Sequence, residues 1–418
     1  MNNNQYDIVL FGATSFVGQI IANYLFNQVG DPNVAKLSIA IAGRSQQKLE
    51  QLRSQLNKGT DSDRDIAIIV ADSFDEAAIS DMCNASRVVL STVGPYDLYG
   101  ETLVKVCAET GTDYCDLTGE IQFYKRMLDR YEAKAQETGA RILHCCGFDS
   151  IPSDMGVFYL QQHSQQKFAE YCSEIDMRVR RVKGGFSGGT VASMLNIAKQ
   201  MGKDKNLRRV MTNPYIICPE SSSNKARQIN VNSAVFDECS DSWAVPFIMA
   251  GVNTRVVLRS AALTGDQYST EFKYNEAMLM GNGNSARRRA KLFSFSLKSF
   301  LLASAIAPTR WLMEKLFLPK PGEGPSPQEQ KDGFYILDFY GKTASGKTLQ
   351  TELRGDADPG YGSTAKIIAQ TALCLTDELA KSEGHQTTGG FFTPASLLGE
   401  HLVNRLEKYA GLTFAIKE

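Results

Sequence analysis

The strongest constraint on the fold lies at the start of the chain. An apolar stretch at residues 6–11 runs into a turn at residues 12–18, and a helical pattern follows over residues 19–27. A strand, a glycine-containing turn and a helix in this order are typical of the start of a nucleotide-binding fold. Gly12 permits the tight turn out of the strand, and Gly18 lets the helix pack close to the sheet. The backbone N–H groups at the start of such a helix can hold a pyrophosphate at the positive end of the helix dipole.

The turn itself provides the first candidate cofactor-binding residues. Its middle position, where such turns usually carry a glycine for close approach to the phosphates, holds Ser15. A small hydroxyl can substitute for this glycine by donating a hydrogen bond to a phosphate oxygen. In another doubly wound protein the same turn would only connect a strand to a helix. We expect the cofactor to contact Gly12, Ala13, Thr14, Ser15, Phe16, Val17 and Gly18.

The end of the next predicted strand, residues 37–42, bears on which dinucleotide binds. An NAD-specific site carries an Asp or Glu there for the ribose 2′-hydroxyl, but this chain continues with Gly43, Arg44 and Ser45. An arginine can grip a phosphate with two parallel hydrogen bonds, so Arg44 beside Ser45, with Lys48 one helical turn on, suits the 2′-phosphate of NADP(H). The alternative is an ordinary solvated arginine in a loop. The missing acid favours NADP(H) as the cofactor.

Composition excludes several classes of function. The chain has 418 residues and a formal net charge of −1, which gives no summed positive field to attract a nucleic acid. Its nine cysteines show no C-x-x-C spacing and its four histidines show no i, i+4 pairing, so we expect no metal site. Residues 1–5 are polar and lack the apolar region of a signal peptide, which predicts a cytoplasmic protein.

Strand and helix patterns alternate through the first third of the chain. Further strands are predicted at residues 65–70, 87–92, 114–117 and 140–145, with helical stretches between them. This alternation requires right-handed crossovers and a parallel sheet, which places functional loops at the carboxyl ends of the strands. A nicotinamide ribose would sit at one of these loops. They add Asp72, Thr92, Val93, Gly94 and Pro95 to the candidate cofactor-binding residues.

The pattern changes after about Pro152. Longer polar segments and glycine clusters separate strands predicted at residues 174–183, 255–262 and 334–342. Such strands indicate a mixed or antiparallel sheet.

Helical patterns return near the end of the chain, at residues 363–381 and 394–409. We therefore predict an α/β protein of three parts. They are an NADP-binding Rossmann domain with a doubly wound parallel sheet (residues 1–150), an α+β substrate and dimerisation domain (residues 151–355), and C-terminal helices that return to pack on the first domain (residues 356–418).

Two residues are candidates for proton transfer, which hydride chemistry needs on the other side of the bond being reduced. Tyr96 offers a phenol that could orient or protonate a substrate, and a tyrosine packed in a turn is an equally good interpretation. Asp149 is the second catalytic candidate because it ends a predicted strand.

Other acids near these loops have two interpretations. Asp116, Thr118 and Glu120 alternate along an extended segment, so their side chains share one face. They could form an acid/base set or cap the following helix, and capping is the preferred interpretation for Glu120. Ser153 or Asp154 would likewise cap the helix that carries residues 157–162.

A basic and apolar segment spans residues 287–316. Lys298 and Arg310 interrupt it, so it does not provide the twenty or so apolar residues that cross a bilayer. Its basic start and apolar body suit an interfacial helix with peripheral membrane or lipid contact, or an apolar wall for a long acyl chain. A buried core or dimer helix explains the pattern equally well.

A series of short motifs is spread in order along the whole chain. They are GATSFVG at residues 12–18, AGR at 42–44, TVGPY at 92–96, YCDLTGE at 114–120, CGFDSIPSD at 146–154, SGGT at 187–190, PGEGPS at 321–326, DPGY at 358–361 and GFFTPA at 390–395. With these motifs the chain resembles the saccharopine dehydrogenase-like oxidoreductases, and within them the branch that includes the bacterial trans-acting enoyl reductases.

The resemblance implies a Rossmann domain, NAD(P)H as the hydride source and, for that branch, reduction of an acyl or enoyl group in lipid or glycolipid synthesis. A small-molecule or carrier-linked acyl substrate is implied with it, and a homodimer through the second domain would suit the family. Two other hypotheses stay open. One is a catalytically silent lipid- or membrane-associated binding protein on the same fold, and the other is a dehydrogenase of amino-acid-like substrates.

Overall fold

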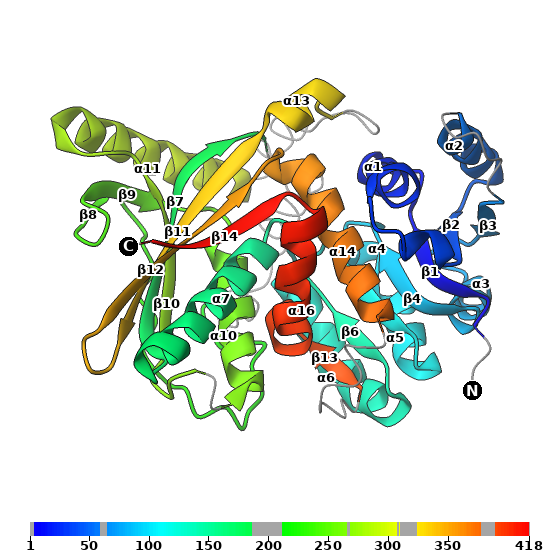
Figure 1. Cartoon of the computed structure of the whole chain (residues 1–418), viewed down its shortest axis with the longest axis horizontal. Coiled ribbons are helices and arrows are strands. Elements are labelled where there is room, and N and C mark those ends of the chain that lie inside the picture. Colours follow the sequence, from blue (N-terminus) through cyan, green and yellow to red (C-terminus); the bar gives the residue numbers. More distant parts are fainter. Residues whose placement is uncertain are drawn as a thin grey trace. The chain divides into compact units, whose positions relative to one another are not determined.

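The computed structural model describes residues 4–58, 65–185, 211–265, 268–306, 309, 324–377 and 389–417. The chain divides into two compact units, whose elements are labelled in Figure 1. The first unit consists of Met1–Phe148, Lys320–Pro325 and Tyr361–Gly411, and the second of Asp149–Pro319, Ser326–Gly360 and Leu412–Glu418.

The first unit is built on a seven-stranded sheet in which the described pairings are all parallel, as predicted for a doubly wound fold. Its strand order is β13-β6-β5-β4-β1-β2-β3. The strands are β1 (Tyr6–Phe11), β2 (Ile39–Gly43), β3 (Ala67–Val70), β4 (Ser86–Ser91), β5 (Asp113–Asp116), β6 (Arg141–Leu143) and β13 (Gly390–Phe392). The order reverses between β1 and β4, and ligands of such sheets bind outside the carboxyl ends of the strands at this point.

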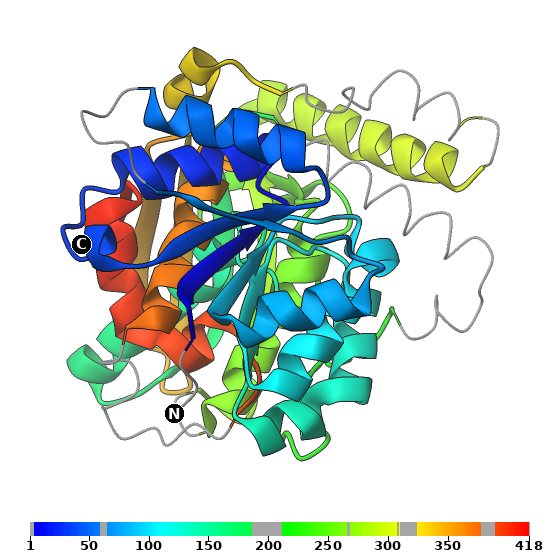
Figure 2. The same ribbon diagram turned by 90° about the vertical axis from the view of Figure 1, so that its right-hand side faces the viewer.

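Helices cover both faces of this sheet, so its central strands are apolar throughout. Ile8, Val9 and Leu10 of β1 are fully buried, as are Val88 and Val89 of β4. Figure 2 shows α3, α5 and α6 on one side of the sheet and α1, α2, α14 and α16 on the other. The helices are α1 (Phe16–Asn23), α2 (Gln46–Asn57), α3 (Glu76–Asn84), α4 (Tyr96–Tyr99), α5 (Glu101–Thr110), α6 (Ile121–Thr138), α14 (Thr364–Thr376) and α16 (Pro394–Tyr409), with short turns η1 (Tyr24–Gln28) and η2 (Val34–Lys36).

A buried ion pair joins three elements of the first unit. The guanidinium of Arg141, at the start of β6, donates to the carboxylate of Asp113 in β5, with Nε 3.0 Å from each oxygen. Its Nη2 also donates to the carbonyl of Leu375 in α14, at 2.8 Å. Because both charged groups are buried, each depends on the other for compensation of its lost hydration.

The second unit contains a mixed seven-stranded sheet of order β14-β12-β11-β7-β10-β9-β8, which confirms the predicted second class of sheet. Strand β10 pairs with β7 in parallel, and the other described pairs are antiparallel. Its elements are α7 (Ile151–Phe168), β7 (Cys172–Lys183), β8 (Val235–Asp237), β9 (Ser242–Pro246), α10 (Ala250–Leu263), β10 (Lys273–Leu279), α11 (Gly283–Ala305), α13 (Pro327–Asp332), β11 (Phe334–Thr343), β12 (Thr348–Gly355) and β14 (Leu412–Lys417), with a short turn, η4 (Pro359–Ser363), at the junction with the first unit.

The strand predicted at residues 255–262 is wrong, because this segment lies inside helix α10. Its buried side chains include Asn253, Val256, Val257 and Ser260, which follow the i, i+3, i+4, i+7 spacing of one helix face. The β-branched valines favour a strand, but burial of this face against the unit's core decides for the helix. Residues 412–417 in turn form strand β14, paired with β12, which their sequence pattern did not indicate.

The buried pair of Arg141 and Asp113 generates a stability prediction. Asp113→Ala leaves a buried guanidinium without its counter-charge, so we expect the free energy of unfolding to fall by about 3–5 kcal/mol. Urea denaturation measures this loss. As a control, Lys125→Ala removes one side of the exposed pair of Lys125 and Asp129 and should cost less than about 1 kcal/mol. Equal losses in both variants would contradict the role given to burial.

Candidate cofactor and active site

The turn after β1 is held by two close backbone approaches. Gly12 has a φ of +87°, and a Cβ placed on it would lie 2.6 Å from Oγ1 of Thr92. A Cβ on Gly18, in the first turn of α1, would lie 2.3 Å from the carbonyl oxygen of Gly12. Neither position has room for a larger residue, so both glycines of the motif follow from the packing of α1 against the turn.

Ser15 links this turn to the loop after β4. Its hydroxyl caps α1 by accepting a hydrogen bond from the backbone N–H of Gly18, at 3.0 Å. It also lies 3.0 Å from the hydroxyl oxygen of Thr92, which in turn lies 3.0 Å from the carbonyl oxygen of Gly12 and donates to it. These contacts occupy the Ser15 hydroxyl within the protein, so the donors left for an anion are backbone N–H groups.

The turn retains such donors. Within the described parts of the chain, the backbone N–H groups of Thr14, Phe16 and Val17 make no hydrogen bond. No acid lies in the first turn of α1, which would otherwise repel an anion. Three free donors at the positive end of a helix, beside glycines that keep side chains away, fit the diphosphate of a dinucleotide.

Two distant motifs also reach this turn. The ring of Phe16 makes an edge contact with the ring of Tyr361, their centroids 4.8 Å apart. A Cβ on Gly324 would lie 2.3 Å from the Phe16 ring, so this glycine is also required by close packing. The sequence pattern singled out the segments around residues 324 and 361 without assigning them a position, and both prove to support the phosphate-fitting turn.

The residues predicted to contact the 2′-phosphate follow β2, and a further candidate cofactor-binding residue, Asp72, follows β3. Arg44 is exposed and makes no hydrogen bond or ion pair with the described residues, and Lys48 is exposed in the first turn of α2. Ser45 caps that helix by accepting from the N–H of Lys48, at 3.4 Å. Asp72, after β3, accepts from the backbone N–H of Phe74 at 3.0 Å. Arg44 therefore has a charge available for a ligand, whereas the side chains of Ser45 and Asp72 shape their own loops.

The loop after β4 runs from Thr92 to Pro95 and leads into α4. Gly94 is exposed and Val93 and Pro95 are partly exposed, while Tyr96 is buried. The Tyr96 hydroxyl donates to the carbonyl of Ser91 at 3.0 Å and accepts from the N–H of Leu117 at 3.1 Å.

Burial raises the pKa of Tyr96 well above its ordinary value, and the charge of Asp116 raises it further. A phenol that is buried, bonded to two backbone groups and hard to ionise favours the packing interpretation of this residue over proton transfer.

Glu120 caps a helix other than the one predicted. It stands before α6, but no bond from its side chain to that helix is found in the described structure. Its carboxylate instead accepts from the backbone N–H groups of Tyr96 and Asp97, at 2.9 and 3.2 Å, and so caps α4. The prediction that Glu120 caps the following helix is therefore wrong. The helix that it caps, α4, lies in another segment of the sequence, and a local pattern does not reveal such a contact.

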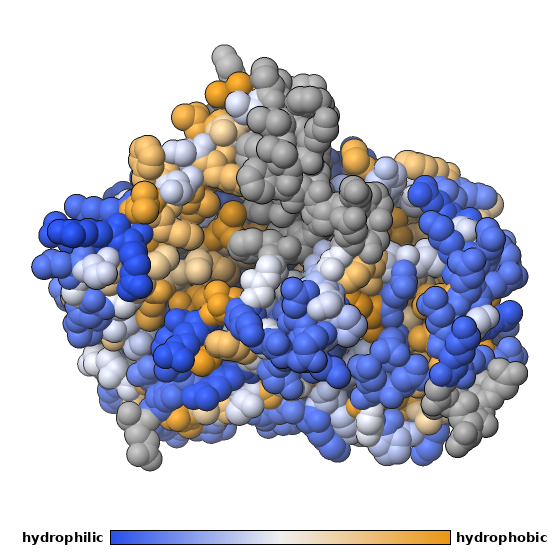
Figure 3. Space-filling view, turned by 90° about the horizontal axis from the view of Figure 1, so that it is seen from above, coloured by the Kyte–Doolittle hydropathy of each residue, from blue (hydrophilic) through white to orange (hydrophobic). Residues whose placement is uncertain are grey.

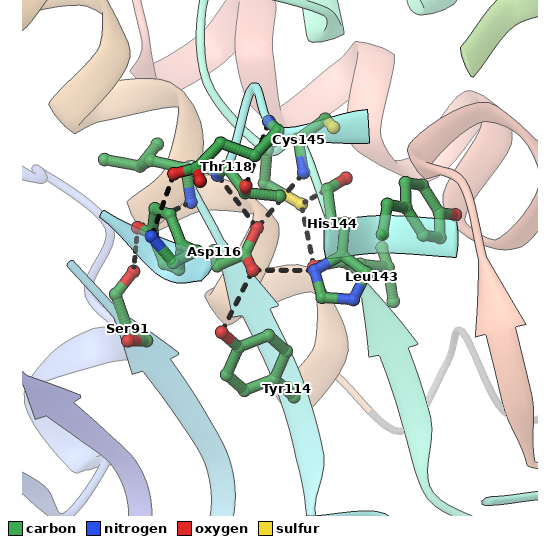
Figure 4. A network of polar contacts seen from close by, with 12 residues as sticks. Ser91, Tyr114, Asp116, Thr118, Leu143, His144 and Cys145 are labelled. Atoms are coloured by element: carbon green, nitrogen blue, oxygen red, sulfur yellow. Dashed lines mark hydrogen bonds and ion pairs between the residues drawn. The ribbon is translucent and has the colours of Figure 1, made fainter. Parts of the chain in front are cut away.

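Asp116 is a buried hub between the ends of β5 and β6 (Figure 4). One carboxylate oxygen accepts from the N–H groups of Thr118 and Cys145, at 3.0 and 3.2 Å. The other lies 3.0 Å from the hydroxyl of Tyr114, which donates to it, and 2.6 Å from Nδ1 of His144. These four contacts satisfy the carboxylate inside the protein, so Asp116 positions two loops and is not exposed to a substrate.

His144 is a site residue that the sequence pattern did not indicate. Its ring is fully buried and lies against the rings of Tyr114, Phe123, Tyr124 and Phe391. Its Nε2 has no hydrogen-bond partner among the described residues. The same residues contain no group of three or more His, Cys, Asp or Glu side chains that could hold a metal ion. A lone histidine at the end of a strand carries no signal that would have assigned it to this carboxylate.

Asp149 begins the second unit. It does not end a strand as predicted, because β6 stops at Leu143 and Asp149 lies in the turn before α7. The side chain is partly exposed, yet burial of its carboxyl raises the pKa to about 6. A minor fraction of this carboxyl therefore keeps its proton near neutral pH, and the carboxyl is a much stronger acid than the phenol of Tyr96.

Polar residues on α7 and α10 fix the turn that carries Asp149. The Ser150 hydroxyl donates to the side-chain oxygen of Asn253 at 3.1 Å, and the Asn253 amide donates to Glu276 at 3.0 Å. Helix α7 starts at Ile151, so the predicted helix caps at Ser153 and Asp154 are wrong. Ser153 instead accepts from Asn253, and Asp154 accepts from Ser260.

The chain was compared with known proteins. Residues 8–143 match the saccharopine dehydrogenase NADP binding domain. A Mycobacterium tuberculosis protein provisionally named a trans-acting enoyl reductase is 36% identical over 411 residues, covering 96% of this chain and 95% of its own. The trans-acting enoyl reductase of Mycobacterium bovis is 33% identical over 428 residues, covering 96% of each chain. The solved structure of saccharopine dehydrogenase (L-Glu forming) from Saccharomyces cerevisiae has a TM-score of 0.54 at 12% identity, covering 99% of this chain and 100% of that one, which shows a shared fold.

The parallel sheet, the phosphate-fitting turn and the matching domain together define an NADP(H)-binding protein of the oxidoreductase class, which confirms the predicted cofactor. Relatives above 30% identity over nearly the whole chain narrow the assignment further. The chain belongs to the saccharopine dehydrogenase-like family, in the branch of the trans-acting enoyl reductases.

The close approach at Gly18 predicts a loss of both stability and cofactor binding in Gly18→Ala. The added Cβ would lie 2.3 Å from a backbone oxygen, so α1 must move away from the turn that presents the N–H groups. We expect stability to fall by about 1–3 kcal/mol and NADPH affinity by roughly tenfold. Gly43→Ala is the control, because the nearest atom to its Cβ would be 3.8 Å away. Thermal denaturation and fluorescence titration measure the two effects, and equal behaviour of both variants would refute the packing argument.

The unpaired charge of Arg44 predicts cofactor selectivity. Arg44→Ala should weaken NADPH binding by roughly tenfold to a hundredfold, the value of a charge-assisted phosphate contact, while NADH binding stays unchanged. Fluorescence titration with both nucleotides measures the difference. Arg53→Ala, further along α2, removes a charge of the same sign and should affect neither. A parallel loss of NADPH and NADH affinity in Arg44→Ala would contradict a role in reading the 2′-phosphate.

Proposed function

We propose that this protein is an NADPH-dependent reductase of an acyl or enoyl group on a small or carrier-linked acyl substrate, acting in lipid or glycolipid synthesis. The observation that carries this proposal is the match to trans-acting enoyl reductases over 96% of the chain, which includes both units. The free N–H groups of the turn after β1 support the cofactor half of the proposal.

The residues divide the work of such a reaction. When bound, NADPH supplies a hydride to the β-carbon of an enoyl group. The N–H groups of Thr14, Phe16 and Val17 would hold its diphosphate and Arg44 its 2′-phosphate, while exposed Gly94 leaves room for the backbone to approach the nicotinamide ribose. The α-carbon of the enoyl group then needs a proton from the protein or from water.

Of the two candidates for proton transfer, we infer that Asp149 has the acidity and exposure that a proton donor needs. Its pKa of about 6 keeps a useful fraction of the carboxyl protonated under physiological conditions, and partial exposure leaves it open to a substrate. The contacts of Ser150 with Asn253 hold the turn in place beside it. Tyr96, the other candidate, has both hydrogen-bonding positions of its hydroxyl occupied by backbone groups.

Steady-state oxidation of NADPH by enoyl-thioesters of several chain lengths tests the proposal. We expect turnover with NADPH, with kcat/KM falling about tenfold per pH unit above pH 6 as the Asp149 carboxyl loses its proton. Asp149→Asn should lose roughly a hundredfold in rate and this pH dependence. Asp81→Asn, at an exposed acid on α3, is the control and should retain both.

The outcomes separate the competing hypotheses. NADPH binding without oxidation by any enoyl- or acyl-thioester would support the catalytically silent binding protein. Turnover of amino-acid-like substrates alone would support a dehydrogenase of such substrates. Enoyl reduction that survives Asp149→Asn with an unchanged pH profile would reject Asp149 but keep the reductase. The homodimer implied by the family resemblance stays a prediction.

A further inference from the structure

Helix α11 has a buried face of small side chains and an exposed face of large apolar ones. Ala286, Ala290, Ser294 and Ser304 are buried, and the helix packs against β9 of the second unit. On the opposite side, exposure is 67% for Leu292, 70% for Phe295, 69% for Leu302 and 51% for Ile306, which directly follows the helix. Helix α11 thus turns Leu292, Phe295 and Leu302 away from the buried face, so the core interpretation does not hold for these side chains of the described helix.

The four exposed apolar residues lie on one side of the helix, with exposed Ser299 between Phe295 and Leu302. Residues 292, 295, 302 and 306 are spaced by three, seven and four, which places them on a single side of a helix. We refer to these four residues as the apolar stripe. Residues 307, 308 and 310–316 of the predicted basic and apolar segment lie outside the described residues.

Positive charge borders the apolar stripe. Arg288, Lys291 and Lys298 are exposed, and each precedes a stripe residue by four positions, one helical turn away. None of the three makes an ion pair with a described residue. Residues 281–306 contain no Asp or Glu, so nothing on the helix neutralises these charges. Figure 3, seen from above relative to Figure 1, shows hydrophobic surface beside a strongly hydrophilic cluster at the left edge of the view.

We propose that the exposed face of α11 binds the surface of an anionic lipid membrane. The apolar stripe enters the boundary between headgroups and acyl chains, and Arg288, Lys291 and Lys298 contact the lipid phosphates, as in other interfacial helices with a basic polar face. Within the described structure, no helix has the combination of length and hydrophobicity needed to cross a bilayer.

Charge argues for a membrane over a second copy of the chain. A two-fold symmetric contact through this face would place the same patch of each copy against the other. The cations of both copies would then meet without any acid from either helix, which is unfavourable. An anionic lipid surface complements both the apolar and the positive parts of the face.

Flotation of the purified full chain with lipid vesicles tests the proposal. We expect binding to vesicles that contain phosphatidylglycerol, weaker binding as salt is raised, and at least tenfold weaker binding to pure phosphatidylcholine vesicles. Binding to both kinds of vesicle with equal strength would overturn the role of the basic residues.

Two variants separate the apolar and basic contributions. Leu292→Ser with Phe295→Ser and Leu302→Ser removes most of the apolar stripe, and Arg288→Glu with Lys291→Glu and Lys298→Glu reverses the charge beside it. Each should weaken vesicle binding by more than about tenfold. The matched control reverses three exposed cations elsewhere in the second unit, Lys225, Lys331 and Lys342, and gives the same change of net charge.

The control variant should still bind vesicles. If it also loses binding, the net charge of the protein explains the loss, and the assignment to α11 is overturned. Light scattering after size exclusion supplies the second measurement. An oligomer that dissociates in the serine variant, together with absent vesicle binding by the natural chain, would assign the face to a second copy instead. Circular dichroism shows whether each variant is folded. NADPH titration of each full-length variant shows whether the cofactor site in the first unit is intact.

Discussion

The packing of α1 against the turn that precedes it is the constraint on which the cofactor site depends. Gly12 and Gly18 leave no space for a side chain between the turn, the helix and Thr92. This close approach exposes the first N–H groups of the helix at the carboxyl end of β1, where the strand order reverses. Ser15 replaces the usual middle glycine without closing the site, because its hydroxyl is directed to Thr92 and Gly18.

Buried carboxylates fix the loops that follow β4, β5 and β6. Asp116 joins the ends of β5 and β6, and Glu120 holds the start of α4, which follows β4. A buried charge is costly unless it is fully hydrogen-bonded, and both carboxylates accept from backbone N–H groups of other loops. The positions of the loops after three neighbouring strands are therefore set by these polar contacts as well as by apolar packing.

The sequence predicted features that depend on local order. The glycine turn, the parallel sheet and the position of Arg44 all follow from the succession of short segments, and the structure has them where expected. It did not predict features decided by distant partners. Glu120 caps a helix from another loop, Phe16 packs on Tyr361, and the helix at Val256 and Val257 forms because of burial that no local preference reveals. The turn of Asp149 shows the same limit, because the strand before it ends at Leu143 and leaves Asp149 in the turn before α7.

The path of the chain through the two units has a consequence for biosynthesis. The first unit begins at the N-terminus, but its sheet is completed at one edge by β13, and α14 and α16 also come from residues beyond 360. Strand β14, which follows β13 and α16 in the chain, belongs to the sheet of the second unit. Neither unit can therefore finish folding before its late segments have been synthesised. The nascent chain must hold an incomplete nucleotide-binding sheet while the residues of the second unit up to Gly360 are made, because β6 pairs with β13 only after that.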